Sequence, residues 1–175
     1  MLGASNIFVT GDLGYYFIPP RYLWVDMVKS LTIPLWNPHN YSGIPLLATL
    51  QLGVFYPPHI FYLFLPFNIV WNWMIILHFA LAGIGMFYLM RQLAASKQGA
   101  LVSGIIFMLS GYLFSNHSQV PYLFSISWCP IVILYCVRYI STLSKKYLVV
   151  ESCLLSVQFF AGAPEISLIT VFLIC

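Results

Sequence analysis

From residue 67 onward the chain consists of long apolar runs separated by short polar turns. The first run covers residues 67–90 and ends at Arg91. A helix of about 20 apolar residues crosses the hydrocarbon core of a bilayer, so this run predicts a membrane-spanning helix. The same pattern predicts further spans at about 100–115, 122–139 and 147–162, and the beginning of a fifth at 166–175. Pro130 lies inside the third span and is expected to kink it.

The first 66 residues have a different pattern. Residues 44–66 are apolar enough to cross a membrane, but they are interrupted by Pro45, Pro57, Pro58 and Pro66. Each proline removes a backbone donor, and lipid offers no substitute partner for the carbonyl that loses it. We therefore predict that this stretch is a re-entrant or surface-lying segment packed on protein.

Composition supports a membrane protein. Of the 175 residues, 61% are hydrophobic and 6% are charged, whereas a soluble domain carries about 25% charged residues. The predicted fold class is an all-α integral membrane protein: a polytopic helix bundle over residues 67–175, preceded by an extended external loop, rich in proline and aromatic residues, over residues 1–66. Within that loop, residues 21–31 are expected to form a short amphipathic helix at the membrane interface. The net charge of +3 is too small and too scattered to suggest a nucleic-acid partner, and none is expected.

Lysine and arginine fall in alternate turns of the predicted bundle. The five beyond residue 90 lie in two turns, with Arg91 and Lys97 in one and Arg138, Lys145 and Lys146 in the other. The turns between, residues 116–121 and 163–165, contain neither lysine nor arginine. By the positive-inside rule the cationic turns are cytoplasmic. The prediction is a multi-pass protein of the cytoplasmic (inner) membrane, with residues 1–66 and the other two turns on its outer face.

Two of the four acids are candidates for chemistry. Asp12 and Glu165 both fall at the predicted outer boundary, in apolar sequence beside glycine or proline. A carboxylate there is costly unless it is paired, bound to a ligand or in a water-filled cavity. Desolvation also raises the pKa of a carboxylate, which suits a general base. Structural roles stay open: Asp12 can cap a helix or pair with Arg21, and Glu165 can stabilise a helix N-terminus after Pro164.

Other polar and aromatic side chains are candidates for substrate contacts. Aromatic rings stack on sugar faces, and external cations suit a phosphate. The residues expected to bind substrate are Arg21, Trp36, Asn37, His39, Tyr56 and His117. His78, alone inside a predicted span, is expected to hydrogen-bond a neighbouring helix. No HxxxH or HExxH spacing and no cluster of metal ligands is visible, so the sequence leaves a divalent-metal cofactor open.

Several motifs occur in an order that gives the chain a family resemblance. They are Gly11-Asp12, PLWNP at 34–38, SGIPLLA at 42–48, QLGVFYPP at 51–58, Leu109-Ser110-Gly111, and Ala161-Gly162 with Pro164-Glu165. In these motifs the chain resembles the amino-terminal part of the YfhO-type bacterial membrane proteins, which belong with the polytopic C-type (GT-C) glycosyltransferases. The resemblance covers nearly all of residues 11–165.

The resemblance implies a fold, an activity and a site. It implies a GT-C-like transferase that moves a sugar from a polyprenyl-phosphate donor to a cell-envelope acceptor at the outer membrane face. In that superfamily an aspartate in the first external loop serves as catalytic base or metal ligand, and Asp12 matches its position. The chain departs from the pattern at Ala163, where relatives tend to carry a polar residue, which weakens a catalytic role for this turn. We also expect the sequence to be a fragment of a longer protein.

Two other interpretations of the sequence stay open. A transporter or flippase-like protein would bind a lipid-linked sugar in the same outer groove without cleaving a bond. Discontinuous segments such as residues 44–66 also occur in transporters, although no inverted repeat is visible within the chain. The third interpretation is an inactive, truncated membrane protein.

Overall fold

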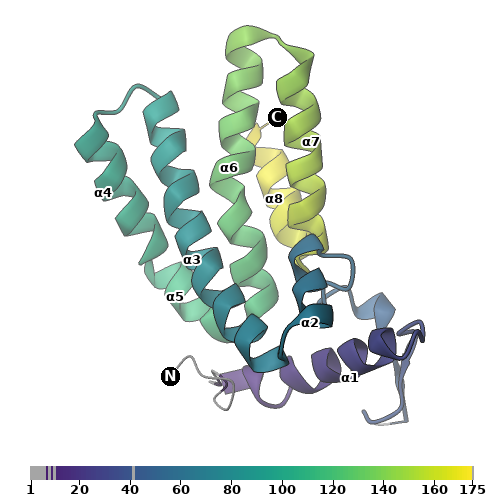
Figure 1. Cartoon of the computed structure of the whole chain (residues 1–175). Helices are drawn as coiled ribbons and strands as arrows, with labels where there is room; N and C mark the ends of the chain where they lie inside the picture. The colour runs from purple at the N-terminus through teal and green to yellow at the C-terminus, as the bar shows by residue number, and fades with distance from the viewer. Residues whose placement is uncertain (1–6, 8, 10, 41, 175) are drawn as a thin grey trace.

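Long helices stand side by side and are closed at one end by short elements (Figure 1). The computed structural model describes residues 7, 9, 11–40 and 42–174. The bundle contains α3 (Phe67–Gln92), α4 (Lys97–Met108), α5 (Gly111–Ser115), η4 (Asn116–Ser118), α6 (Val120–Thr142), α7 (Lys145–Phe160) and α8 (Pro164–Ile174). Residues 11–66 form the cap, with η1 (Gly11–Leu13), α1 (Ile18–Lys29), β1 (Trp36–Asn37), β2 (Ile44–Pro45), η2 (Leu47–Thr49), η3 (Pro57–Ile60) and α2 (Phe61–Phe64).

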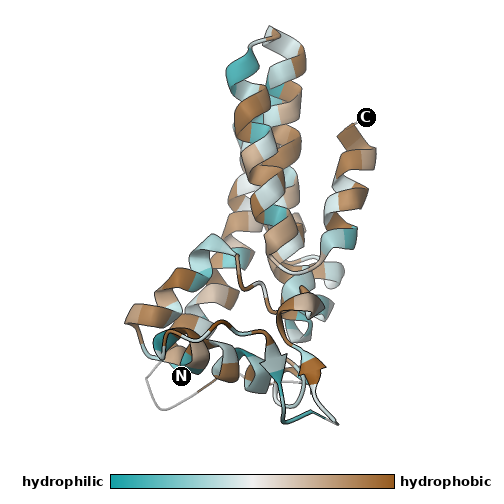
Figure 2. Ribbon diagram, turned by 90° about the vertical axis from the view of Figure 1, so that its right-hand side faces the viewer, coloured by the Kyte–Doolittle hydropathy of each residue, from teal (hydrophilic) through white to brown (hydrophobic). Residues whose placement is uncertain are grey.

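Three helical segments among the described residues are long and apolar enough to cross a membrane. They are Phe67–Gln92, Lys97–Ser118 and Val120–Thr142. The long helices carry hydrophobic residues along their length (Figure 2), and Leu77 and Ile84 of α3 are exposed. A helix that is hydrophobic on every face suits a lipid environment. The predicted helical bundle is therefore supported, with α7 and α8 as shorter helices of 16 and 11 residues.

The span predicted at residues 100–115 is not one regular helix. α4 ends at Met108, and α5 begins at Gly111. The hydroxyl of Ser110 accepts a hydrogen bond from the backbone N–H of Leu113 at 3.4 Å and caps the new helix. A serine that competes for a free N–H in this way favours a helix start over a helix interior.

Glycines bring α3 close to both of its neighbours, α4 and α6. A Cβ at Gly104 of α4 would lie 2.7 Å from the carbonyl oxygen of Gly83. A Cβ at Gly85 would lie 2.7 Å from Cγ1 of Ile131 in α6. Gly83, Gly85 and Gly104 therefore allow the close contacts between these helices.

α1 lies across the end of the bundle (Figure 1). Pro19 and Pro20 occupy its first turn, where the missing N–H groups have no intrahelical partner to lose. Its buried residues are Ile18, Arg21, Trp24 and Val25. Asp26 and Lys29 are exposed, as expected for the polar side of the helix. The helix is shifted from the predicted 21–31, because it begins at the prolines and ends before Leu31, which has a φ of +58°.

Residues 44–66 contain no spanning helix. They form β2, η2, η3 and α2, none longer than 4 residues. The prediction of a segment that lies against protein is confirmed by its buried side chains, which include Leu46, Leu52, Tyr56 and Tyr62. These side chains join the lower parts of α3 and α6 in one hydrophobic core, so the core lies where the cap meets the bundle.

Candidate functional site

The eight residues predicted to form a site divide into two groups in the structure. Asp12, Trp36, His39 and Glu165 are exposed, and His117 is half-buried. Arg21, Asn37 and Tyr56 are buried. The first group lies at the cap end of the molecule and faces outward, whereas the second group holds the cap together.

Asp12 projects from η1 beside the turn between α5 and α6. Gly11, with a φ of +52°, approaches Ser118 of η4 so closely that a Cβ would lie 3.4 Å from the serine Cβ. The neighbouring Leu13 is fully buried and anchors the segment. The Asp12 carboxylate makes no hydrogen bond or ion pair within the described part of the chain, so the alternative that it pairs with Arg21 is wrong. His117 on the same turn contacts the carbonyl oxygen of Phe114 through Nδ1.

Glu165 lies in the first turn of α8, at the turn that leads out of α7. Its exposed carboxylate lies near the Tyr122 phenol at the start of α6. The hydroxyl of Ser125 donates to the carbonyl of Gln158 at 3.2 Å and accepts from the N–H of Ala163 at 3.2 Å, which fixes the turn from below. Glu165 is therefore an exposed acid that follows a turn held in place by hydrogen bonds to Ser125.

The short strands β1 and β2 present the other exposed candidates. Trp36 pairs with Pro45, and Asn37 pairs with Ile44. The Trp36 ring covers Gly43, which has a φ of +100° and no room for a side chain. The buried Asn37 uses its side-chain oxygen to accept from the N–H of His39 at 2.9 Å. Asn37 thus shapes the turn, while Trp36 and His39 reach solvent.

Tyr56 belongs to a buried chain of hydrogen bonds with His78 and Trp128. The indole N–H of Trp128 donates to the Tyr56 oxygen at 2.7 Å, and the Tyr56 hydroxyl lies 2.6 Å from Nε2 of His78. Nδ1 of His78 lies 2.6 Å from the carbonyl oxygen of Met74. Because the Met74 carbonyl can only accept, Nδ1 of His78 carries a proton, and in a neutral ring Nε2 then accepts from the Tyr56 hydroxyl. These hydrogen bonds join the cap to α3 and α6. His78 was expected to bond a neighbouring helix, but its side-chain partner is Tyr56 of the cap.

Arg21 occupies the centre of the cap. Its guanidinium donates to the carbonyl of Gln51 at 3.1 Å and lies 5.5 Å from the ring centroid of Trp71. Burial lowers the pKa of Arg21 to about 10. Burial and the nearby Arg21 charge lower the pKa of His59 well below 6.5, and burial raises the pKa of the Tyr62 phenol. Arg21 is fully buried, so it faces the protein core and not the outer surface where a substrate cation was expected.

Sequence reasoning did not find the backbone contact that joins the cap to the α7–α8 turn. Gly162 has a φ of +111°, and a Cβ there would lie 2.9 Å from the carbonyl oxygen of Gln51. The same Gln51 carbonyl accepts from Arg21, and its side chain accepts from the hydroxyl of Tyr16 at 3.0 Å. The glycine at position 162 was the only local signal, and it did not identify the partner segment.

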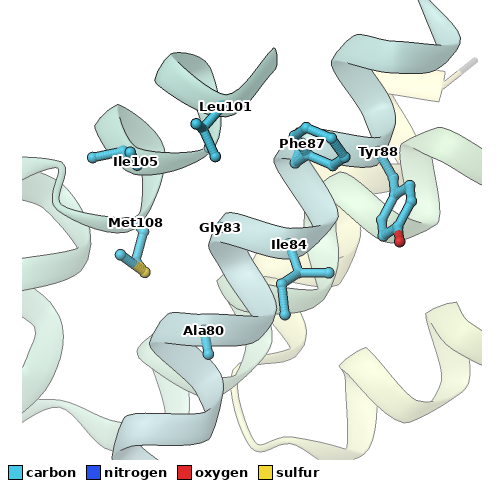
Figure 3. A pocket seen from close by; sticks show the side chains of 9 residues that line it. Ala80, Gly83, Ile84, Phe87, Tyr88, Leu101, Ile105 and Met108 are labelled. Carbon is cyan, nitrogen blue, oxygen red and sulfur yellow. The ribbon is translucent and has the colours of Figure 1, made fainter. Parts of the chain in front are cut away.

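An apolar groove of about 440 Å³ opens between α3 and α4 (Figure 3). Ala80, Gly83 and Ile84 of α3 face Leu101, Ile105 and Met108 of α4 across it. The groove suits an acyl or isoprenoid chain and offers no catalytic group. Within the described residues, no group of three histidines, cysteines or acids is placed to hold a metal ion.

Comparisons with protein-family models, with curated proteins and with solved structures found no match. The exposed acids and the folded cap around them are therefore the observations from which a function is inferred.

Proposed function

We propose that the protein acts as a membrane glycosyltransferase of the GT-C-like kind. In this proposal it takes a sugar from a polyprenyl-phosphate donor at the outer face of the cytoplasmic membrane and passes it to a cell-envelope acceptor. The observation that carries the proposal is the position of Asp12, an exposed carboxylate on an anchored segment at the cap end that makes no hydrogen bond or ion pair with the described residues. A carboxylate that is held in place without an ion pair can accept a proton from the hydroxyl of an incoming acceptor.

The distribution of charge supports an outward orientation of the cap. The turns between α3 and α4 and between α6 and α7 lie at the end opposite α1 (Figure 1). The helix ends that flank these two turns carry five of the seven lysine and arginine residues. Under the positive-inside rule that end faces the cytoplasm, and Asp12 and Glu165 then face the outer side.

In the proposed reaction, Asp12 takes the proton from the acceptor hydroxyl as its oxygen attacks the anomeric carbon. The bond between that carbon and the phosphate oxygen breaks, and polyprenyl phosphate leaves with the electron pair. The exposed rings of Tyr15, Tyr16 and Trp36 at the cap end suit the faces of a sugar. Lys29, exposed at the end of α1, is the cation of the cap that is accessible to the leaving phosphate.

A matched pair of variants tests the transferase. Asp12→Asn is expected to lower transfer from a radiolabelled polyprenyl-phosphate sugar, in membranes that express the chain, by about 100-fold or more, the usual contribution of a general base. Asp26→Asn removes another exposed aspartate of the cap and should leave transfer unchanged. Near-normal transfer by Asp12→Asn would reject the role of Asp12.

A second candidate is favoured by the apolar groove between α3 and α4. A protein that binds and moves a lipid-linked sugar needs a groove for the lipid chain and no base. It predicts movement of the labelled lipid across the membrane of reconstituted vesicles without a new glycosylated product. Movement that persists in Asp12→Asn would favour this candidate over the transferase.

A further inference from the structure

The groove between α3 and α4 combines an apolar lining with two cations at one end. Its volume of about 440 Å³ falls in the range of sites that hold a small ligand. The lining consists of apolar side chains, two glycines and the ring of Tyr88 (Figure 3). Along α3 it runs from Ala80 to Tyr88, a length of about 12 Å at 1.5 Å per residue. The groove is therefore long and apolar, which suits a hydrocarbon chain.

Arg91 and Lys97 continue the two walls of the groove toward the turn between α3 and α4. On α3, Arg91 lies one helical turn beyond Phe87, which lines the groove. On α4, Lys97 lies one helical turn before Leu101, which lines the opposite wall. Residues four apart in a helix share a face. Both cations therefore stand at the end of the groove that is nearest the turn.

These two cations are accessible to a ligand. Both are exposed, and Lys97 makes no hydrogen bond or ion pair within the described part of the chain. The guanidinium of Arg91 has several N–H groups, and one of its nitrogens donates to the carbonyl of Ala95 at 2.7 Å. No aspartate or glutamate occurs between positions 27 and 150 of the sequence, so neither helix nor their turn holds an acid that balances the two charges.

An apolar groove that ends at two unbalanced cations is complementary to a lipid with an anionic headgroup. A lipid tail gains little from apolar contact alone, because the bilayer around it is equally apolar. The groove therefore accommodates the chain by its shape, and the charges select the headgroup. Guanidinium and ammonium groups both donate to phosphate oxygens in short, charge-assisted hydrogen bonds.

A second copy of the chain is a poorer occupant of the same groove. Two copies in one membrane share the same orientation, so packing groove against groove brings Arg91 and Lys97 of both copies to the same depth. The unbalanced cations of the two copies would then face each other, and like charges repel. A phosphate group removes this repulsion, whereas a second copy doubles the charge.

We propose that the groove between α3 and α4 binds an anionic phospholipid, with one acyl chain in the groove and the phosphate at Arg91 and Lys97. Phosphatidylglycerol is the probe. The cationic end of the groove lies opposite α1, at the end that the positive-inside rule assigns to the cytoplasm (Figure 1). The site is independent of the proposed transferase and of Asp12, which belongs to the cap.

The test is native mass spectrometry of the full chain in detergent micelles, titrated with phosphatidylglycerol or with phosphatidylcholine of the same acyl chains. Each cation beside an anionic headgroup changes affinity about 5-fold, so phosphatidylglycerol should bind about 25-fold more tightly than phosphatidylcholine. Lys97→Gln should weaken phosphatidylglycerol binding about 5-fold.

Lys145→Gln is the matched control for Lys97→Gln. Lys145 is also an exposed lysine at the first position of a helix, after a serine, but no residue of its helix α7 lines the groove. Phosphatidylglycerol should bind this variant normally. Equal dissociation constants for the two lipids, or equal losses in the two variants, would overturn the proposal.

Photocrosslinking locates the acyl chain. Phosphatidylglycerol with a diazirine on one acyl chain should label peptides that carry Ala80 or Met108, and excess unlabelled phosphatidylglycerol should remove this label. Ala80→Leu fills the groove and should abolish the competed labelling. Cys153→Leu enlarges an exposed side chain of α7 outside the groove and should leave it unchanged. Label spread evenly over the helices, or stronger competition by polyprenyl phosphate than by phosphatidylglycerol, would reject a phospholipid as the occupant.

Discussion

The bundle and the cap are stabilised by different kinds of interaction. In the bundle, α3 packs on its neighbours through apolar side chains and glycines such as Gly83 and Gly104. In the cap, buried polar and aromatic side chains make the decisive contacts, with Tyr56 hydrogen-bonded to both α3 and α6. The bundle is a fold that many apolar sequences can adopt, whereas the cap depends on particular donors and acceptors.

This difference predicts where single substitutions act. Apolar contacts in a membrane-type bundle are numerous and individually small, so the loss of one is tolerated. A buried donor or acceptor that loses its partner keeps its full desolvation cost. The largest effects of conservative changes should therefore lie in the cap and at its junction with the bundle.

The largest effect is expected at Gly162, where the cap and the bundle meet backbone to backbone. In Gly162→Ala the new Cβ lies 2.9 Å from the Gln51 carbonyl oxygen, which is a steric clash. The φ of +111° is also strained for alanine, so both effects destabilise the folded state. We expect the free energy of unfolding, measured by denaturant titration in mixed micelles, to fall by about 3 kcal/mol. Gly111→Ala is the control, because nothing lies within 4 Å of a Cβ there. Equal losses of unfolding free energy in the two variants would contradict a close backbone contact between Gly162 and Gln51.

The second effect tests the hydrogen-bond chain in the cap. Tyr56→Phe leaves Nε2 of His78 and the indole N–H of Trp128 buried without their partner. The free energy of unfolding should fall by about 2 kcal/mol. Tyr88→Phe, which removes an exposed hydroxyl from α3, should change it by less than about 0.5 kcal/mol. If Tyr56→Phe lowers the free energy of unfolding by no more than Tyr88→Phe does, the hydrogen bonds of Tyr56 contribute little to the stability of the cap.

The difference between the bundle and the cap also explains which parts of the fold were predictable from the sequence. The apolar runs predicted the long helices α3 and α6, because a membrane-type helix depends on its own composition. The prolines predicted that residues 44–66 do not span, again from a local property of the backbone. The break at Ser110 was missed, since a single serine in an apolar run carries little signal against the hydrophobic pattern.

The candidate site was predicted less well. Asp12 and Glu165 were expected at an outer boundary, and both are exposed at the cap end. Arg21 was expected to bind substrate, yet its neighbours His59 and Tyr62 come from a segment about 40 residues away and enclose it. Such contacts depend on how distant segments meet, and neither spacing nor composition within one segment contains that information.

A third, smaller effect is the pH dependence of the cap. The pKa of His59 lies well below 6.5 in the folded state, so below pH 6.5 the unfolded chain binds a proton that the folded chain does not. Stability therefore falls as the pH falls, by up to about 1.4 kcal/mol per pH unit for this group. His59→Gln should flatten the fall between pH 6.5 and 5 at constant ionic strength, and the exposed His39→Gln should not. Identical profiles for the wild type and His59→Gln would contradict this assignment.

The smallest effect is expected at the exposed acids, and it separates function from folding. Asp12→Asn should change the free energy of unfolding by less than about 0.5 kcal/mol, because the Asp12 carboxylate has no partner in the described structure. Glu165→Gln should lower it by up to about 1 kcal/mol, because this carboxylate lies in the first turn of α8, where a negative charge stabilises the helix N-terminus. Thermal unfolding of the two variants in the same detergent measures both changes. A large loss in Asp12→Asn would mean that the carboxylate stabilises the cap, and a loss of transfer in that variant would then no longer identify a catalytic base.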